Sequence, residues 1–121
     1  MFGIYGKNKK KKIIYSFPGN PVSSFVSYTV FFKDVLNAKF FNTERYIRAK
    51  CIDSIKKNDN KTHFIRGQMN FDVKTNQIFV KKIGSQSSGN FSGLTNANCL
   101  IVFNEKRSCI KERELVECIP I

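Results

Sequence analysis

The spacing of apolar residues changes character near residue 42. Before that point, the apolar run Ile13–Phe17 follows a lysine cluster and stops at Pro18-Gly19, which predicts a short strand ended by a turn. From Pro21 the apolar residues recur at helical spacing, which predicts an amphipathic helix over residues 21–37. Residues 1–41 are thus predicted to form strand, tight turn and helix, one piece of an α/β unit with no second strand beside it.

After residue 42 the pattern is that of β-structure. The predicted strands are Tyr46–Ile55, Phe64–Phe71, Ile78–Lys82, Cys99–Phe103 and Leu115–Ile119. In the first of these, Ile47, Ala49 and Cys51 share one face, and Asp72–Asn76 has the composition of a hairpin turn. Short strands at this spacing predict a small barrel or sandwich. The predicted fold class is α+β, with an α/β remnant over residues 1–42 and an all-β, barrel-like domain over residues 43–121.

Composition and charge narrow the class of protein. A chain of 121 residues with 41% hydrophobic and 25% charged residues is globular rather than disordered. The formal net charge of +12 favours an anionic partner, such as nucleic acid, a membrane surface, phosphate or an oxyanion. No apolar run reaches the roughly 18 residues of a membrane helix. Pro18–Pro21 breaks the only stretch that imitates a signal peptide, so we expect a cytoplasmic protein.

The cysteines do not predict a metal site. Cys51, Cys99, Cys109 and Cys118 contain no C-x-x-C pair, and His63 is the only histidine. Because zinc sites draw on closely spaced ligands, this spacing favours buried, reduced thiols. No metal ligand is predicted in this chain.

The turn Phe17–Ser23 is the sharpest local signal for a binding site. Asn20 is a favoured N-cap, Pro21 is a favoured first helical residue, and Gly19 allows a ligand to approach the backbone. We expect free amide groups near Ser23 and Ser24, which would form an anion site at the helix N-terminus. An ordinary strand-to-helix turn explains the same residues equally well.

Two further features suggest anion chemistry. The segment Gly84–Gly93 is rich in Ser, Gly and Asn, and its hydroxyl groups could wrap an oxyanion, although its composition alone favours a solvated loop. Arg66 lies inside an otherwise apolar strand, where arginine usually points to solvent. With Lys81 and Lys82 on a neighbouring strand, Arg66 could instead complete an anion pocket.

Four motifs in order resemble the molybdopterin molybdenumtransferases, the family of the bacterial MoeA proteins and the E domain of gephyrin. The motifs are Phe17-Pro18-Gly19-Asn20-Pro21-Val22-Ser23, His63-Phe64-Ile65-Arg66-Gly67, residues 86–101 and Glu114-Leu115-Val116-Glu117. The third runs from Gln86-Ser87-Ser88-Gly89 to Ala97-Asn98-Cys99-Leu100-Ile101 and is similar to the family's C-terminal signature, with Ser87 and Gly93-Leu94 as departures. The chain resembles about the last third of such a protein, so we expect a fragment, a split-gene product or a truncated gene.

The resemblance implies a reaction and a set of site residues. Family members transfer molybdate into adenylylated molybdopterin, with magnesium, to form molybdenum cofactor and AMP. The residues that match the pterin- and molybdate-binding turn are Pro18, Gly19, Asn20, Pro21 and Ser23. Arg66 matches the arginine that reaches the oxyanion, and Ser87, Ser88 and Ser92 are candidates for its serine partner. Arg66 and Ser23 are thereby the expected catalytic residues.

The same resemblance sets expectations for cofactor and partners. The carboxylates that would hold Mg²⁺ have no counterpart in this chain, so we expect its ligands, and the rest of the site, to come from a missing N-terminal portion. The complete enzyme is expected to be a homodimer that acts on an anionic small molecule, without a membrane or a specific nucleic acid as partner.

Two other functions fit the sequence. A basic nucleic-acid-binding β module would pair stacking rings with phosphate contacts, through Lys56, Lys57, Phe64, Arg66, Phe71, Phe79, Lys81 and Lys82. A non-catalytic structural or docking fragment would need an exposed apolar patch.

Overall fold

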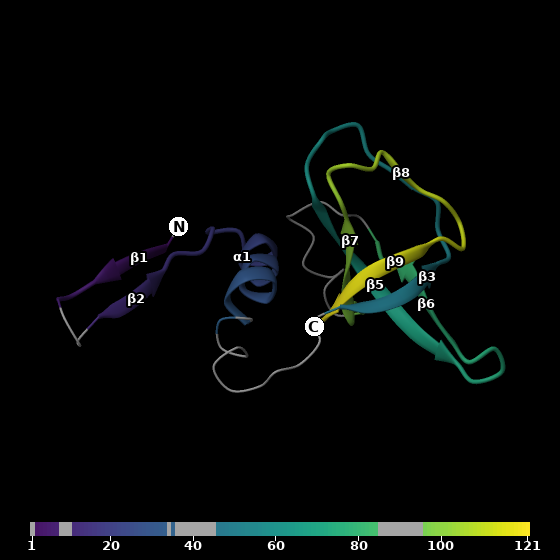
Figure 1. The fold of residues 1–121 in the computed structure, drawn as a ribbon, viewed down its shortest axis with the longest axis horizontal. Helices are drawn as coiled ribbons and strands as arrows, with labels where there is room; N and C mark the ends of the chain where they lie inside the picture. Colours follow the sequence, from purple (N-terminus) through teal and green to yellow (C-terminus); the bar gives the residue numbers. More distant parts are fainter. Residues whose placement is uncertain (1, 8–10, 34, 36–45, 85–95) are drawn as a thin grey trace.

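The computed structural model describes residues 2–7, 11–33, 35, 46–84 and 96–121. The elements in chain order are β1 (Phe2–Tyr5), β2 (Lys12–Tyr15), α1 (Pro21–Ser27), η2 (Tyr28–Phe32), β3 (Ile47–Cys51), β4 (Ile55–Lys56), β5 (His63–Asp72), β6 (Gln77–Lys82), β7 (Cys99–Phe103), β8 (Cys109–Ile110) and β9 (Leu115–Pro120). Figure 1 shows three parts along the long axis: the β1–β2 hairpin, the helical segment and the barrel.

Five strands close into a barrel in the order β3-β6-β5-β7-β9. Four of the five contacts are antiparallel, and β3 pairs in parallel with β6 through Lys50↔Phe79 and Cys51↔Val80. Closure gives each strand an inner face, so the alternating apolar residues form one core. Its members include Ala49, Cys51, Val80, Cys99, Ile101, Phe103 and Cys118, each at most 1% exposed. The prediction of a small β-barrel is confirmed.

The predicted β5–β6 hairpin is also confirmed, and its turn has a clear local cause. The Asp72 carboxylate accepts hydrogen bonds from the amide of Lys74 (3.0 Å) and the hydroxyl of Thr75 (2.7 Å). Asn76 then adopts a left-handed conformation with φ of 54°, which asparagine tolerates better than most residues. The register that follows pairs Gln68 with Lys81, a contact that matters for the site.

The helical segment packs on the outside of the barrel. Val30 of η2 is buried against Leu100 of β7 and Ile119 of β9, and the half-buried side chains around this second cluster include Val26 and Phe64. The ammonium group of Lys33 donates to the carbonyl of Pro120 (3.3 Å). These contacts join the two motif-bearing regions of the chain, the helix after Pro18–Pro21 and the strand that carries Arg66.

The N-terminal strands differ from the prediction. The expected strand is present as β2, but it has a neighbour, because β1 pairs with it in antiparallel register from Phe2↔Tyr15 to Tyr5↔Lys12. The expectation of a lone strand is therefore wrong. The segment Phe2–Tyr5 is short, contains Gly3 and is followed by Gly6, so it does not stand out in the apolar pattern. The α/β remnant remains a prediction, and its boundary at residue 42 lies outside the described residues.

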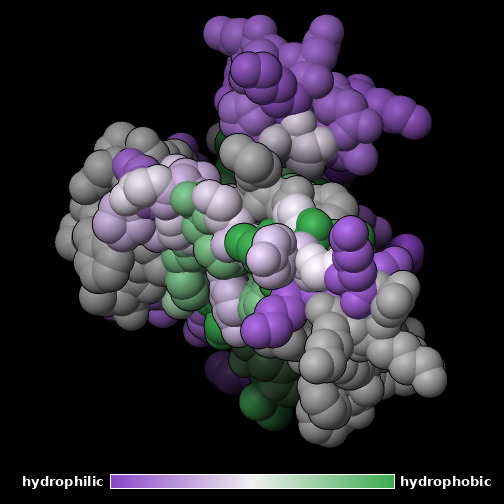
Figure 2. Space-filling model, turned by 90° about the vertical axis from the view of Figure 1, so that its left-hand side faces the viewer, coloured by the Kyte–Doolittle hydropathy of each residue, from purple (hydrophilic) through white to green (hydrophobic). Residues whose placement is uncertain are grey.

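The hairpin exposes apolar side chains. Ile4, Tyr5, Ile13 and Ile14 are between 55% and 71% exposed. Figure 2 looks at the hairpin end of the molecule and shows hydrophobic residues there beside hydrophilic ones. A two-stranded hairpin has no interior of its own, so this surface remains open to contact with another partner.

Candidate functional site

The turn before α1 is built around Asn20, as the sequence predicts. Its Oδ1 accepts hydrogen bonds from the amides of Val22 (3.0 Å) and Ser23 (3.2 Å), and its carbonyl accepts from the amide of Ser24 (2.9 Å). The hydroxyl of Ser24 donates back to the carbonyl of Pro18. The expectation of free amides near Ser23 and Ser24 is therefore wrong, because the cap itself takes them.

The turn still presents a reachable surface. Pro18, Gly19 and Pro21 are exposed, and Asn20 and Ser23 are half-buried. A Cβ at Gly19 would meet nothing within 4 Å, so the space beside it is open. The assignment of these five residues to substrate binding stays a prediction, now through side chains and open surface rather than through helix amides.

Arg66 is buried, contrary to the usual position of an arginine in such a strand. It is 2% exposed and pairs with Leu100 across β5 and β7. Because side chains alternate along a strand, Arg66 shares the outer face of β5 with Phe64, which packs against the cluster under the helical segment. The structure thus places Arg66 on the barrel wall next to the helix contact, and its role in oxyanion binding stays a prediction.

Gly67, the residue after Arg66, faces the packed interior of the barrel, and this role was not predicted from the sequence. A Cβ at Gly67 would lie 3.0 Å from Ile101 Cγ1, 3.0 Å from Val80 Cγ2 and 3.1 Å from Cys99 Sγ. Only glycine fits this inward position without displacing side chains of two neighbouring strands. A glycine inside an apolar strand was the available signal, since it often marks a close approach.

A cavity of about 310 Å³ lies at the end of β6 nearest Gly84. Its lining residues are Gln68, Lys81, Lys82, Ile83, Gly84 and Asn96. The two lysines predicted to form an anion pocket are therefore in one cavity, whereas Arg66 is not among its lining residues. Gln68 and Asn96 were not predicted, although their amide groups belong to the same surface. Ser87, Ser88 and Ser92 lie outside the described residues.

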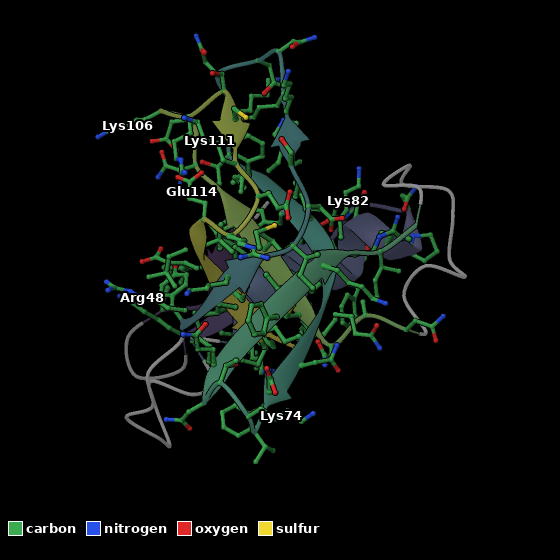
Figure 3. The ribbon with its side chains drawn as sticks, turned by 90° about the vertical axis from the view of Figure 1, so that its right-hand side faces the viewer. Arg48, Lys74, Lys82, Lys106, Lys111 and Glu114 are labelled. Atoms are coloured by element: carbon green, nitrogen blue, oxygen red, sulfur yellow. The ribbon has the colours of Figure 1, made fainter. Side chains whose placement is uncertain are left out.

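A second groove of about 430 Å³ crosses the outer face of β3, β7 and β9. Its charged residues are Arg48, Lys106, Arg107 and Glu117. Arg107 forms an ion pair with Glu114, and the amide of Lys111 donates to the same carboxylate (2.7 Å), which lowers the pKa of Glu114. In Figure 3, Lys106, Lys111 and Glu114 gather on the side of the barrel away from Lys82. The carboxylates of Glu114 and Glu117 thus neutralise part of the positive charge around this groove.

Three of the four cysteines belong to the core of the barrel. Cys51, Cys99 and Cys118 are buried and Cys109 is half-buried, all as free thiols, which confirms the predicted burial for three of them. Burial raises the pKa of Cys51, and a hydrogen bond with Cys99 together with burial raises that of Cys118, so neither is a ready thiolate nucleophile. Within the described ranges, no three Cys, His, Asp or Glu side chains form a group that could hold a metal ion.

The residues of the nucleic-acid hypothesis do not form one surface. Lys57 is 8% exposed, donates to the carbonyl of Lys61, and lies 5.0 Å from the centre of the Phe103 ring. Arg66 is buried and Phe64 packs under the helical segment, whereas Phe71 is 58% exposed. Stacking of successive bases requires accessible rings beside accessible cations, and burial removes Lys57 and Arg66 from such a surface.

Comparison with known proteins identifies the family. The family model described as MoeA C-terminal region (domain IV) matches residues 48–121. The chain therefore belongs to the MoeA family and corresponds to a C-terminal portion of its members. The family also includes the matched part of gephyrin. Gephyrin from Dictyostelium discoideum is 27% identical over 119 residues, which cover 90% of this chain and 16% of gephyrin.

Solved structures support the same fold. The molybdopterin biosynthesis MoeA protein from Pyrococcus horikoshii and a molybdenum cofactor biosynthesis protein from Pyrococcus furiosus each superpose with a TM-score of 0.68 at 24% identity. Each match covers 85% of this chain, and 26% and 36% of the respective structures. The chain thus spans about a sixth to a third of these relatives. In the part of the chain that the structure describes, no helix is long and apolar enough to cross a membrane.

Proposed function

We propose that this chain forms the C-terminal part of a molybdenum insertase, which transfers molybdate into adenylylated molybdopterin to form molybdenum cofactor with release of AMP. Membership of the MoeA family supports the class, since relatives are described by their part in molybdenum cofactor biosynthesis. The observation that carries the proposal is the buried Arg66 beside the contact between the barrel and the helix of the Pro-Gly-Asn-Pro turn.

Arg66 has the chemistry that an oxyanion needs. A planar guanidinium binds an oxyanion through two parallel hydrogen bonds, and the burial of Arg66, which is 2% exposed, limits competition from water. The turn residues Pro18, Gly19, Asn20, Pro21 and Ser23 would contact the pterin side of the substrate. Ser87, Ser88 and Ser92 remain candidates for the serine that assists Arg66.

The proposed site would be completed by residues from the remainder of the enzyme or from a second subunit. The described residues offer no group of carboxylates that fits Mg²⁺, so its ligands would come from the remainder of the enzyme, and we derive no step through the metal. The exposed apolar hairpin, with Ile4, Tyr5, Ile13 and Ile14, is the surface on which the N-terminal portion or a second subunit would pack. A homodimer in the complete, cytoplasmic enzyme is part of this proposal.

Complementation tests the function. The chain is co-expressed with the N-terminal portion of a MoeA protein in a strain that lacks the insertase, and molybdenum cofactor is measured. We expect cofactor synthesis to be restored with the wild-type chain and reduced with Arg66→Lys or Arg66→Ala. Lys74→Ala, an exposed lysine at the hairpin tip, is the matched control. Failure of the wild-type pair would refute the proposal.

The same experiment separates catalysis from docking alone. A non-catalytic fragment would also use the exposed hairpin, and would bind the N-terminal portion without restoring cofactor. A defect of Arg66→Ala that excess molybdate rescues would assign Arg66 to oxyanion binding. Wild-type activity of Arg66→Ala at limiting molybdate would remove Arg66 from the site.

A further inference from the structure

The cavity at the end of β6 is lined by hydrogen-bond donors from both β5 and β6. The β5–β6 register places Gln68 directly opposite Lys81, and the amide of Ile83 donates to the carbonyl of Arg66 (2.9 Å). Since side chains alternate, Arg66 and Gln68 share the outer face of β5, and Lys81 shares that of β6. The cavity therefore adjoins the face of β5 that carries Arg66, because its lining residue Gln68 is the next residue after Arg66 on that face.

The charges around this cavity favour an anion. Its described lining residues are two lysines, two residues with side-chain amides, Ile83 and Gly84, and none of these described residues is a carboxylate. The Oδ2 of Asp53 accepts a hydrogen bond from the amide of Lys82 (2.5 Å). This places negative charge beside Lys82 and leaves Lys81, on the opposite face of β6, as the principal cation. The larger groove differs, because Glu117 and Glu114 lie among its cations.

We propose that this cavity is a subsite for a tetrahedral oxyanion, bound by the Lys81 ammonium group and oriented by the side-chain amide of Gln68. Lysine supplies a compact point charge, and an amide supplies directed N–H donors, which together suit a small oxyanion. A volume of about 310 Å³ is at the small end of ligand pockets, which span about 300–1,000 Å³. The subsite rests on the proposed function, in which it holds an oxyanion before transfer to Arg66.

Two substrates of the proposed reaction carry this chemistry: molybdate and the phosphate groups of the adenylylated pterin. Binding of molybdate, inorganic phosphate and AMP to the full chain is measured separately by isothermal titration calorimetry. The ionic strength is held constant, because a net charge of +12 attracts any anion at low salt. Preference for molybdate assigns the cavity to the metal oxyanion, and preference for phosphate and AMP assigns it to the nucleotide.

The variants are Lys81→Gln and Gln68→Leu, with Lys74→Gln as the matched control. Lys74 lies in the turn of the same hairpin, and Figure 3 shows it at the opposite end from Lys82. We expect Lys81→Gln to raise the dissociation constant of the preferred anion roughly tenfold, the effect of losing one charge-assisted hydrogen bond. Lys74→Gln should leave it within about twofold, and Lys81→Arg should retain part of the affinity.

Circular dichroism and the urea midpoint confirm that each variant is folded. An unchanged dissociation constant in Lys81→Gln, an equal loss in Lys74→Gln, or no anion binding by the wild-type chain would overturn the subsite. Complementation distinguishes the two proposals. A chain that restores cofactor synthesis but binds anions without Lys81 refutes the subsite alone. A chain that binds anions through Lys81 but does not complement refutes the proposed function alone.

Discussion

The barrel and the N-terminal hairpin are both made of short strands with apolar residues, yet they treat those residues in opposite ways. Val80, Cys99 and Ile101 in the barrel are fully buried, whereas Ile4 and Ile13 in the hairpin are 64% and 57% exposed. Closure makes the difference, because a five-stranded barrel has an interior and two strands have none. The barrel thus buries its apolar residues within its own interior, whereas the hairpin leaves its apolar side chains exposed.

The largest expected effect comes from removing a core ring. Phe103→Ala should lower the free energy of unfolding by about 3–5 kcal/mol, because it leaves a cavity at a side chain that is 1% exposed. Ile13→Ala in the hairpin should change it by no more than about 0.5 kcal/mol. Urea unfolding followed by circular dichroism measures both. Similar losses for the two variants would contradict the contrast between barrel and hairpin.

A smaller effect is expected at Gly67. The methyl group of Gly67→Ala would press on Ile101, Val80 and Cys99, and should lower the free energy of unfolding by about 1–3 kcal/mol. Gly19→Ala adds the same group to open space and should shift the value by no more than about 0.5 kcal/mol. The same urea titration compares them. A stable Gly67→Ala variant would show that the barrel yields at this contact.

Loss of the helix cap should act locally. Asn20→Ala removes the acceptor for the amides of Val22 and Ser23, and should destabilise the helical segment by about 1 kcal/mol. Hydrogen exchange should become faster at the amides of the first helical turn and stay unchanged in β5 and β7. Asn58→Ala, at an exposed position in the β4–β5 loop, is the control. Faster exchange throughout the barrel would instead tie its stability to the cap.

The smallest effect concerns pH. The hydrogen bond from His63 to Asp59 (2.8 Å) lowers the pKa of the Asp59 carboxyl. A lowered carboxyl pKa stabilises the folded state above the unfolded value near 3.9, and this contribution disappears as pH falls through the lower folded value. Asp59→Asn should therefore be slightly less stable than wild type near pH 5 and equal to it at the acid end of the range. Urea midpoints at several pH values measure the difference. A difference in urea midpoint between wild type and Asp59→Asn that persists or widens in acid would contradict the lowered pKa of Asp59.

The sequence predicted the parts of the fold whose pattern is local. The alternation of Ala49 and Cys51, the apolar run Cys99–Phe103 and the Asn20 cap all appear in the structure. It did not predict β1, β4 or β8, because two to four residues carry too little periodicity. The burial of Arg66 and the cavity beside Lys81 depend on strand register and barrel closure, which no local pattern encodes.

The position of β3 has a consequence for the nascent chain. Its register partners in β9, such as Glu117 opposite Arg48, are synthesised long after β3 itself. Until then one edge of β3 stays open, and an open apolar edge invites pairing between chains. Arg48 and Lys50 alternate with Ile47, Ala49 and Cys51, so every second side chain carries a charge. In the finished barrel these cations face outward, and along an unfinished strand charges at alternate positions disfavour pairing with another chain.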